Sequence, residues 1–495
     1  MKNFKEILDT EETLDPQDWS TMRQLGHQML DDMFTYLETT TQRPVWTPTT
    51  EGVRAAFQQP LPTEPTDAAT IYDDFKRDIL PFNKGNVHPR FWSWVEGGGT
   101  PLGMLADMLA SGMNPNTTIG DHAAMQVDRQ VIDWSKSLFG LPTTATGMLV
   151  SGGAMANISA IVVARNSFSE KIRTEGNAAA GGQLTLYAST ETHNCLVKAA
   201  EVIGIGRDNL REVPVGDDFR MDVSALKKMI FDDKHAGKVP FCIVGNAGTV
   251  NTGAIDPLDE LLQVARTEGL WLHIDGAFGA VAKLTDEFAA ELKAIEQADS
   301  LAFDFHKWFY VNYEVGCFLI RNGDLHRKAF ALTATYLAAH ERGLAAGLDP
   351  MANYGLELSR GFKALKVWMS LREHGAEKYA RLVRQNVAQA FYLGDLVENA
   401  RELELLSPVT MNIVCFRFKP ADLSDDDILN ALNKEILMRL QEQGIAAPSY
   451  TMLTGRYAIR CAICNHRSRK SDFEALVAGV LTIGRAVLEE NLVEL

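Results

Sequence analysis

The chain has 495 residues, more than a single hydrophobic core normally organises, so we expect two or three domains. Hydrophobic residues make up 46% of it and charged residues 23%, as in an ordinary globular protein. The formal net charge of −16 argues against DNA or RNA as a partner, because nucleic-acid binding depends on clustered Lys and Arg.

The start of the chain has no apolar stretch of the kind found in a secretory signal, since it reads MKNFKEILDTEETLDPQDW. Apolar runs elsewhere are short, such as 147–150 and 242–244, and none approaches the roughly 20 residues of a membrane span. The six scattered cysteines do not form a disulfide framework. These features predict a cytoplasmic enzyme with reduced cysteines and no membrane partner.

The first 90 residues have a helical and amphipathic pattern. Apolar residues recur at helical spacing over 22–37, and the prolines at 60–65 interrupt the pattern. We expect an N-terminal helical segment, 1–90, of the kind that often covers a neighbouring subunit.

From about residue 147 to 321, short apolar runs alternate with helical segments. The pattern predicts strands at 148–150, 184–188, 241–244, 271–274, 301–303 and 317–320. It predicts helices between them at 156–165, 194–203, 223–236 and 258–268. Such alternation is typical of an α/β domain with a mainly parallel sheet, in which ligands bind at the carboxyl ends of the strands.

The remaining sequence predicts a smaller α+β domain. We expect a long helix at 356–375 that joins two domains, followed by elements at 412–418 (strand), 425–443 (helix), 457–463 (strand) and 471–490 (helix). The predicted domains are therefore 91–372, large and α/β, and 373–495, small and α+β.

Cys461 and Cys464 form a lone CxxC pair with His466 nearby. A zinc site needs four ligands, and no second pair is spaced to supply them. Residues 457–464 also alternate like a half-buried strand, which favours a structural role and no bound metal.

Four predicted strand ends carry unusual residues. Ser151-Gly152-Gly153-Ala154 stands between a strand and a helix, where backbone N–H groups and a helix N-terminus could hold a phosphate. A tight turn that binds nothing would look the same, and the third glycine of a dinucleotide fingerprint is missing. His193 follows the next strand and could stack on a flat ligand, although a lone histidine is more often structural.

Asp275 and Lys307 are the unusual residues at the other two predicted strand ends. Asp275 ends a very apolar strand, so its carboxylate needs a positive partner such as a pyridinium N–H, unless it caps a helix. Lys307 lies among aromatic residues, where loss of solvation would lower the pKa of its amine and favour attack on a carbonyl.

Together these segments resemble the group II pyridoxal-5′-phosphate (PLP) decarboxylases, and among them the aromatic-L-amino-acid decarboxylases, including bacterial tryptophan decarboxylase types. The likeness covers nearly the whole chain and is carried by HPRFW at 88–92, LADM at 105–108, SGGAMAN at 151–157, His193, NAGT at 246–249, HIDGA at 273–277, HKW at 306–308 and RCAIC at 460–464.

The resemblance implies PLP fold type I, the aspartate aminotransferase-like fold, and a homodimer with active sites at the subunit interface. It implies that Lys307 carries PLP as a Schiff base, with Asp275 on the pyridine nitrogen. His193 would stack on the ring, which Ala277 supports from below, and Thr249 would lie near its substituents. The phosphate would be surrounded by Gly152, Gly153, Ala154 and His306.

The resemblance also implies a mobile loop at 335–337, in which Tyr336 returns a proton to the product. An aldehyde synthase would carry phenylalanine there, so Tyr336 favours simple decarboxylation of an L-amino acid to an amine and CO2. An aminotransferase shares the fold, and Arg460 does not separate the two classes. A PLP-fold protein that only binds is disfavoured by the intact Lys307 and Asp275.

Two positions depart from many relatives. Asp304 stands where they have Asn, and Phe305 where they have Pro, which places an extra acid near the predicted phosphate site. Ala154 replaces a serine found in some relatives, so backbone N–H groups must bind more of the phosphate. We include Asp304 among the cofactor-binding residues with its role open.

The substrate is the least determined part. The segment around His88, Trp92, Trp94 and Gly97 matches the side-chain pocket of relatives, and aromatic walls suit an indole or phenol ring. Tryptophans in an ordinary core would look the same. An acidic or diamino substrate such as glutamate, aspartate or diaminobutyrate would need a charged partner, which for glutamate Arg90 or Lys84 could supply. We predict an aromatic substrate: tryptophan, phenylalanine, tyrosine or a hydroxylated relative.

Overall fold

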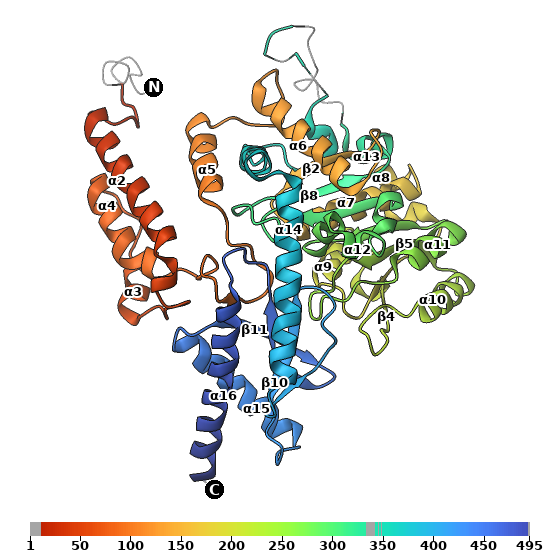
Figure 1. The fold of residues 1–495 in the computed structure, drawn as a ribbon. Coiled ribbons are helices and arrows are strands. Elements are labelled where there is room, and N and C mark those ends of the chain that lie inside the picture. Colours follow the sequence, from red (N-terminus) through yellow and green to blue (C-terminus); the bar gives the residue numbers. More distant parts are fainter. Residues whose placement is uncertain (1–10, 333–341, 345, 348, 494–495) are drawn as a thin grey trace. The chain divides into compact units, whose positions relative to one another are not determined.

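The computed structural model describes residues 11–332, 342–344, 346–347 and 349–493 (Figure 1). The chain divides into two compact units, Met1–Gly85 and Asn86–Leu495, which are treated separately below. Within the described residues, no helix is both long and apolar enough to cross a membrane.

The first unit is helical, as expected. It contains α2 (Trp19–Glu38), α3 (Glu51–Ala56), α4 (Ala68–Asp74) and the short turns η1 (Thr40–Gln42), η2 (Phe75–Ile79) and η3 (Leu80–Phe82). Asp18 begins α2 because its carboxylate accepts hydrogen bonds from the backbone N–H groups of Ser20 and Thr21. The Tyr72 hydroxyl of α4 donates to Asp32 Oδ2 of α2 at 2.7 Å, so the two helices are joined.

A seven-stranded sheet forms the centre of the second unit, in the order β2-β8-β7-β6-β5-β3-β4. Its strands are β2 (Thr146–Val150), β3 (Leu184–Ser189), β4 (Leu210–Val213), β5 (Val239–Asn246), β6 (Trp271–Asp275), β7 (Ser300–Asp304) and β8 (Gly316–Ile320). The pairs from β4 to β7 are parallel, whereas β8 runs antiparallel to both β7 and β2. The mainly parallel sheet and its six expected strands are therefore confirmed, and β4 is additional.

Helices cover this sheet (Figure 1). Those that contact its strands are α6 (Ala123–Phe139), α7 (Gly153–Phe168), α9 (Cys195–Val202), α10 (Val223–His235), α11 (Leu258–Glu268) and α13 (Gly323–Phe330). Three others, α5 (Pro101–Met113), α8 (Ile172–Glu175) and α12 (Asp286–Ala289), pack mainly on other helices and turns. The described residues of this unit also form the 3-10 turns η4 (Asn177–Ala180), η5 (Arg207–Asn209), η6 (Gly279–Leu284), η7 (Lys293–Gln297) and η9 (Met351–Tyr354). The four helices expected between strands are all present, with ends shifted by a few residues.

The expected helix at 356–375 starts too early, but its expected end is confirmed. The observed helix begins at Ala364, and a kink at Gly375, with φ of 67° and ψ of 155°, separates it from a second helix; α14 (Ala364–Glu398) comprises both. Residues before it are held in an irregular path because Thr117 N donates to Arg360 O at 2.8 Å. The Arg360 side chain also forms a buried ion pair with Asp128 at 3.1 Å. These tertiary contacts outweigh the local helical pattern.

A second sheet has the order β1-β11-β12-β10-β9. It contains β1 (Phe91–Trp92), β9 (Leu403–Leu405), β10 (Ile413–Phe418), β11 (Ala447–Leu453) and β12 (Arg456–Ala462), packed with α15 (Asp426–Glu442) and α16 (Lys470–Val493). Strand β1 pairs in parallel with β11, although the two lie more than 350 residues apart in sequence. The expected domain limits at 90/91 and 372/373 stay predictions.

Strand β12 corrects the expectation of a half-buried strand at 457–464, because both of its faces are buried. Ala458 and Ala462 belong to the core around the large sheet, whereas Ile459 and Cys461 belong to the core under α15 and α16. All six cysteines, including Cys464, are free and buried. Within the described residues, no group of three His, Cys, Asp or Glu side chains could hold a metal ion.

Candidate active site

A cavity of about 380 Å³ opens at the carboxyl edge of the large sheet. Seven of the residues singled out from the sequence line it: Trp94, Gly153, Ala154, His193, Asp275, Ala277 and Lys307. They come from the ends of β2, β3, β6 and β7 and from the segment after β1. Strand ends far apart in sequence therefore meet in one recess, as the parallel sheet requires.

Lys307 and Asp304 form a buried ion pair just after β7. Lys307 Nζ lies 2.9 Å from Asp304 Oδ2, and the Asp304 side chain is only 1% exposed. Burial by itself lowers the pKa of the Lys307 amine, but the charges of Asp304 and Asp275 outweigh it and raise that pKa above its ordinary value. The amine is thus an ammonium group held in place by an acid.

Two glycines, which have no side chain, leave room for the Asp304 carboxylate. Strand β8 lies between β7 and β2, and Gly316 faces both Asp304 and Val150 in register. A Cβ on Gly316 would lie 2.6 Å from Asp304 Oδ1, and a Cβ on Gly153 would lie 2.7 Å from Oδ2. The carboxylate therefore reaches the glycine turn at the start of α7.

Asp275 ends a hydrogen-bond chain that crosses the sheet. Its Oδ1 accepts from Ala277 N at 3.1 Å, and its Oδ2 accepts from Asn157 Nδ2 at 3.0 Å. Asn157 Oδ1 lies 2.7 Å from His273 Nε2, and His273 Nδ1 lies 2.8 Å from Ser300 Oγ.

The directions of these bonds follow from the carboxylate, which only accepts. The Asn157 amide must turn its nitrogen toward Asp275, so its oxygen accepts from His273 Nε2–H. Burial lowers the pKa of His273 to about 3, so the ring is neutral and its Nδ1 accepts from the Ser300 hydroxyl. Burial also raises the pKa of Asp275, and the charge of Lys307 and then the hydrogen bond from Ala277 N–H oppose that shift.

His193 projects into the cavity after β3. Its Nδ1 accepts from Cys195 N at 3.1 Å, which leaves the proton of the neutral ring on Nε2. Burial lowers the pKa of His193, although Asp275 opposes the shift. The ring is therefore neutral near pH 7 and able to pack against a flat ligand.

Four predicted cofactor residues are not among those that line the cavity: Asp304, described above, and His306, Thr249 and Gly152. His306 is held by Val315, whose N–H lies 3.1 Å from His306 Nδ1, and its ring packs 4.3 Å from that of Tyr313. Thr249 is buried with its hydroxyl 3.0 Å from that of Thr252. Gly152 lies in the glycine turn, and a Cβ there would be 3.3 Å from His306 Cε1.

The predicted substrate residues are placed differently from one another. Trp94 lines the cavity, whereas Trp92 is buried in the core of the second sheet, stacked on Phe473 at 4.8 Å. His88 is 5% exposed and is not a lining residue. Gly97 packs against the backbone of His306 and Lys307. Its N–H donates to His306 O at 3.1 Å, and a Cβ there would overlap the carbonyl oxygens of both residues. Tyr336 lies outside the described residues.

The sequence matches the pyridoxal-dependent decarboxylase conserved domain over residues 51–419. An aromatic-L-amino-acid decarboxylase from Bacillus atrophaeus is 33% identical over 469 residues, covering 94% of this chain and 96% of that protein. The chain belongs to the pyridoxal-dependent decarboxylase family.

Two further relatives of this decarboxylase are informative. A phenylacetaldehyde synthase from Petunia hybrida is 28% identical over 474 residues, with 92% of each chain covered. The crystal structure of Oryza sativa TDC with PLP and tryptamine superposes with a TM-score of 0.87 at 23% identity, covering 96% of this chain and 100% of that one. That likeness confirms the expected PLP fold type I.

The cavity of this decarboxylase fits PLP. Lys307 offers an amine for the aldehyde, Asp275 a carboxylate for the pyridine nitrogen, and Gly153 opens a helix N-terminus for the phosphate. In the described part of the chain, Lys307 is the one hydrogen-bond partner of the buried Asp304 carboxylate, so this end of the cavity is polar and has unused hydrogen-bonding capacity.

Some residues of the decarboxylase site were given no role by sequence reasoning. Asn157 lies one turn into α7, and only its place in the family motif drew attention to it. Tyr313 and Tyr450 line the cavity from segments far apart in sequence, and no local pattern marked them. Arg460 also lines it and donates to the carbonyl oxygens of Trp94 at 2.8 Å and Asn251 at 3.1 Å.

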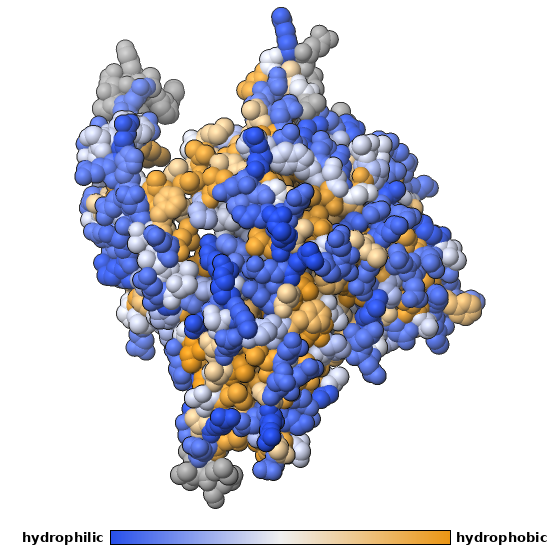
Figure 2. Space-filling view, viewed as in Figure 1, coloured by the Kyte–Doolittle hydropathy of each residue, from blue (hydrophilic) through white to orange (hydrophobic). Residues whose placement is uncertain are grey.

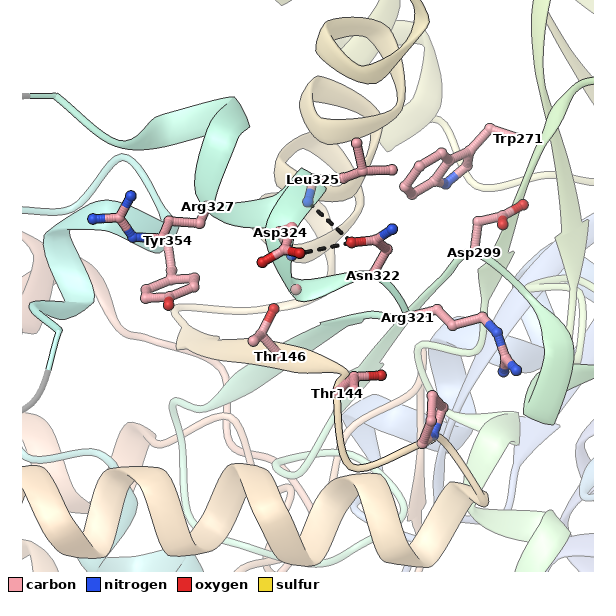
Figure 3. Close-up of a pocket in the computed structure, with 12 residues that line it drawn as sticks. Thr144, Thr146, Trp271, Asp299, Arg321, Asn322, Asp324, Leu325, Arg327 and Tyr354 are labelled. Atoms are coloured by element: carbon pink, nitrogen blue, oxygen red, sulfur yellow. Dashed lines mark hydrogen bonds between the residues drawn. The ribbon is translucent and has the colours of Figure 1, made fainter.

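A larger cavity, of about 810 Å³, lies at the opposite edge of the same sheet (Figure 3). Its lining includes Trp271 at the start of β6, Asp299 just before β7 and Asn322 after β8. The polar groups there are engaged: Asn322 Oδ1 accepts from the first residues of α13, and Asp299 accepts from Leu272 N at 2.8 Å. This cavity has no amine or strand-end acid comparable to Lys307 and Asp275, so we assign the chemistry to the smaller one.

Proposed function

We propose that this protein removes the α-carboxylate of an aromatic L-amino acid, with PLP carried by Lys307. The observation that carries the proposal is one cavity in which Lys307, Asp275 and His193 face aromatic side chains, including Trp94 and Tyr450. Membership of the family supports the type of reaction, and the lining of the cavity supports the roles of the individual side chains.

PLP, when bound, accepts the electron pair that remains after the Cα–carboxylate bond breaks. Asp275 keeps the proton on the pyridine nitrogen by charge pairing, supported by Asn157. His193 would lie against the face of the ring, and Lys307 would supply the amine that attaches the cofactor and later releases the product. Gly152 and Gly153 leave the N-terminus of α7 open for the phosphate.

The lining of the cavity favours an aromatic substrate over an acidic one. Trp94, Tyr313 and Tyr450 provide ring surfaces for an indole or phenol. Arg460 is the cation that could meet a side-chain carboxylate, but its guanidinium already donates to three backbone carbonyls and to Ser449 Oγ. The aromatic-L-amino-acid decarboxylase from Bacillus atrophaeus supports the same choice.

The test is CO2 release from each L-amino acid by the PLP-loaded protein, with amine and aldehyde products separated. We expect turnover of tryptophan, phenylalanine, tyrosine or a hydroxylated relative, with the amine as product. Turnover restricted to glutamate, aspartate or diaminobutyrate would overturn the aromatic assignment. Aldehyde as the main product would instead identify the activity named for the Petunia hybrida relative.

We also propose that Tyr336 delivers the proton to Cα, as the family resemblance implies. Replacing its hydroxyl in Tyr336→Phe removes that proton source, and we expect aldehyde to appear at the expense of amine. Unchanged amine production by this variant would assign the proton to another group.

We further propose a cytoplasmic homodimer. Helix α5 exposes Met108, Leu109 and Met113, and apolar residues gather over this helix in Figure 2, where a second copy could bury them. In the first unit, α2 has no buried residue and exposes Trp19 and Met22. The six free cysteines suit a reducing compartment. Light scattering should give twice the 54.7 kDa chain mass, and a monomer would contradict the dimer.

A further inference from the structure

We propose that Asp304 holds Lys307 as an ammonium group in the cofactor-free protein and takes one proton from it when PLP is loaded. The proposal rests on Lys307 as the attachment point, as stated above, and does not depend on the substrate. It assigns Asp304 the role of a positioning residue that acts through the Lys307 amine.

The isolation of the carboxylate supports this role. Asp304 is almost fully buried, its Oδ2 is 2.9 Å from Lys307 Nζ, and among the described residues no donor other than Lys307 forms a hydrogen bond to either oxygen. A buried carboxylate without donors is costly in its charged form unless a cation is close. Lys307 is that cation, so the charged form of each group depends on the charge of the other.

The other titratable groups around Asp304 do not replace Lys307. They are His306, His193, Asp275, Tyr313, Cys195 and Cys317. Burial lowers the pKa of both histidines and raises that of the tyrosine and both thiols, so these five are neutral near pH 7. His306 Nε2 is also farther away, at 3.9 Å from Asp304 Oδ2. The remaining member, Asp275, is itself an acid.

Loading PLP changes both partners of the ion pair. The amine must lose a proton before it can attack the aldehyde carbon. The phosphate binds at the glycine turn, where a Cβ on Gly153 would already be 2.7 Å from Asp304 Oδ2, so a charged carboxylate there would repel it. Moving one proton from Lys307 to Asp304 meets both requirements, because it frees the amine and neutralises the acid.

The step balances in atoms and charge. One N–H proton of the ammonium moves to an Asp304 oxygen, leaving a neutral amine and a neutral carboxyl group. A carbon–nitrogen double bond then forms to the aldehyde carbon, and the aldehyde oxygen leaves as water with the two remaining amine hydrogens. Nothing is oxidised or reduced, and no further reactant is needed.

The experiment compares the wild-type apoprotein with Asp304→Asn, which keeps the shape of the side chain and removes its charge. The rate of PLP attachment is followed by absorbance from pH 5.5 to 9. Without Asp304 the buried amine loses its proton more easily, so we expect the midpoint of the rate profile to move about one to three pH units lower. Coincident profiles would overturn the proposal.

Proton counting gives an independent readout. At a pH below both midpoints, PLP binding is measured by calorimetry in two buffers that differ in ionisation enthalpy. Asp304→Asn should release about one proton more per site than the wild type, because it has no acid to receive it. Equal proton release would refute the transfer even if the rate profiles differ.

Two controls separate the possible failures. Asp128→Asn breaks another buried ion pair, with Arg360, that does not line the cavity, and should leave the midpoint unchanged. If Asp304→Asn does not fold, Asp304→Ser removes the same charge in less volume and should give the same shift. Borohydride reduction followed by peptide mass spectrometry locates the PLP adduct. An adduct elsewhere than Lys307 defeats the proposed function, whereas an adduct at Lys307 with coincident profiles defeats only the role of Asp304.

Discussion

Asn157 provides the sharpest test of how the sheet supports the cofactor. Its amide donates to Asp275 Oδ2 at 3.0 Å and accepts from His273 at 2.7 Å. In Asn157→Leu, Asp275 loses a hydrogen bond to its charged form, and His273 Nε2–H loses its acceptor. The Asp275 carboxylate then holds its proton more tightly and pairs less well with the pyridine nitrogen of PLP.

The expected size follows from the bond that is lost. A hydrogen bond to a charged group contributes about 1.5–3 kcal/mol. At about 1.4 kcal/mol for each factor of ten, the dissociation constant for PLP should rise about 10- to 150-fold. Titration of the apoprotein with PLP, followed by absorbance and fluorescence, measures this constant directly.

A matched control lies on the same helix. Asn166 of α7 is also buried, and its Nδ2 donates to Ala329 O at 3.1 Å, away from Asp275. Asn166→Leu makes the same chemical change and should affect stability but not PLP affinity. A change of less than twofold in Asn157→Leu, or an equal loss in Asn166→Leu, would refute a specific link from Asn157 to Asp275.

Three other substitutions test the packing against Lys307, one buried histidine and the aromatic wall of the cavity. Gly97→Ala should impair PLP attachment in reconstitution assays, because its Cβ would lie 2.5 Å from His306 O and overlap Lys307 O. Burial lowers the pKa of His326 to about 4, so the unfolded chain binds a proton below pH 6.5 that the folded protein refuses. The free energy of unfolding therefore decreases as pH falls from about 6.5 toward 4, by up to about 1.4 kcal/mol per pH unit. In His326→Asn, denaturant titrations at several pH values should show a weaker dependence of this free energy on pH. Trp94→Ala should raise KM for an aromatic substrate several-fold while changing PLP affinity little, as steady-state kinetics and PLP titration would show.

Strands with strong local patterns could be predicted from the sequence, and those defined by their neighbours could not. The run at 271–274 is apolar except for His273 and became β6. In contrast, β4 reads Leu-Arg-Glu-Val and is a strand because it pairs with β3 at the edge of the sheet. Strand β11 contains Pro448 and several hydroxyl side chains, and it forms between β1 and β12 in the second sheet. Strand β12 follows it after a short turn, but its other partner, β1, lies more than 350 residues away, where local periodicity carries no information.

The residues of the candidate site also fall into two groups, those that the local sequence predicted and those that only the tertiary structure brings to the cavity. Asp275 and Lys307 were predicted because each follows a strand, and parallel strands bring their carboxyl ends together. Trp92 and Trp94 looked equivalent in sequence, but β1 ends at Trp92, and the positive φ of 51° at Trp94 turns the chain out of the strand path. Trp92 therefore entered the core beside Phe473, while Trp94 reached the cavity. Tyr450 joined the wall only because β11 folds back onto this region, which local pattern could not reveal.

The wall of the cavity depends on the C-terminal sheet through Arg460. This residue lies on β12, whose two faces are buried in different cores, and its guanidinium holds the carbonyl oxygens of Trp94, Val250 and Asn251. Burial lowers the pKa of Arg460, and five N–H donors on one rigid group suit it to several carbonyls at once. Because lysine has three donors on a flexible stem, it could not hold the same set in place. Arg460 thus shapes the wall of the pocket by fixing the backbone around it.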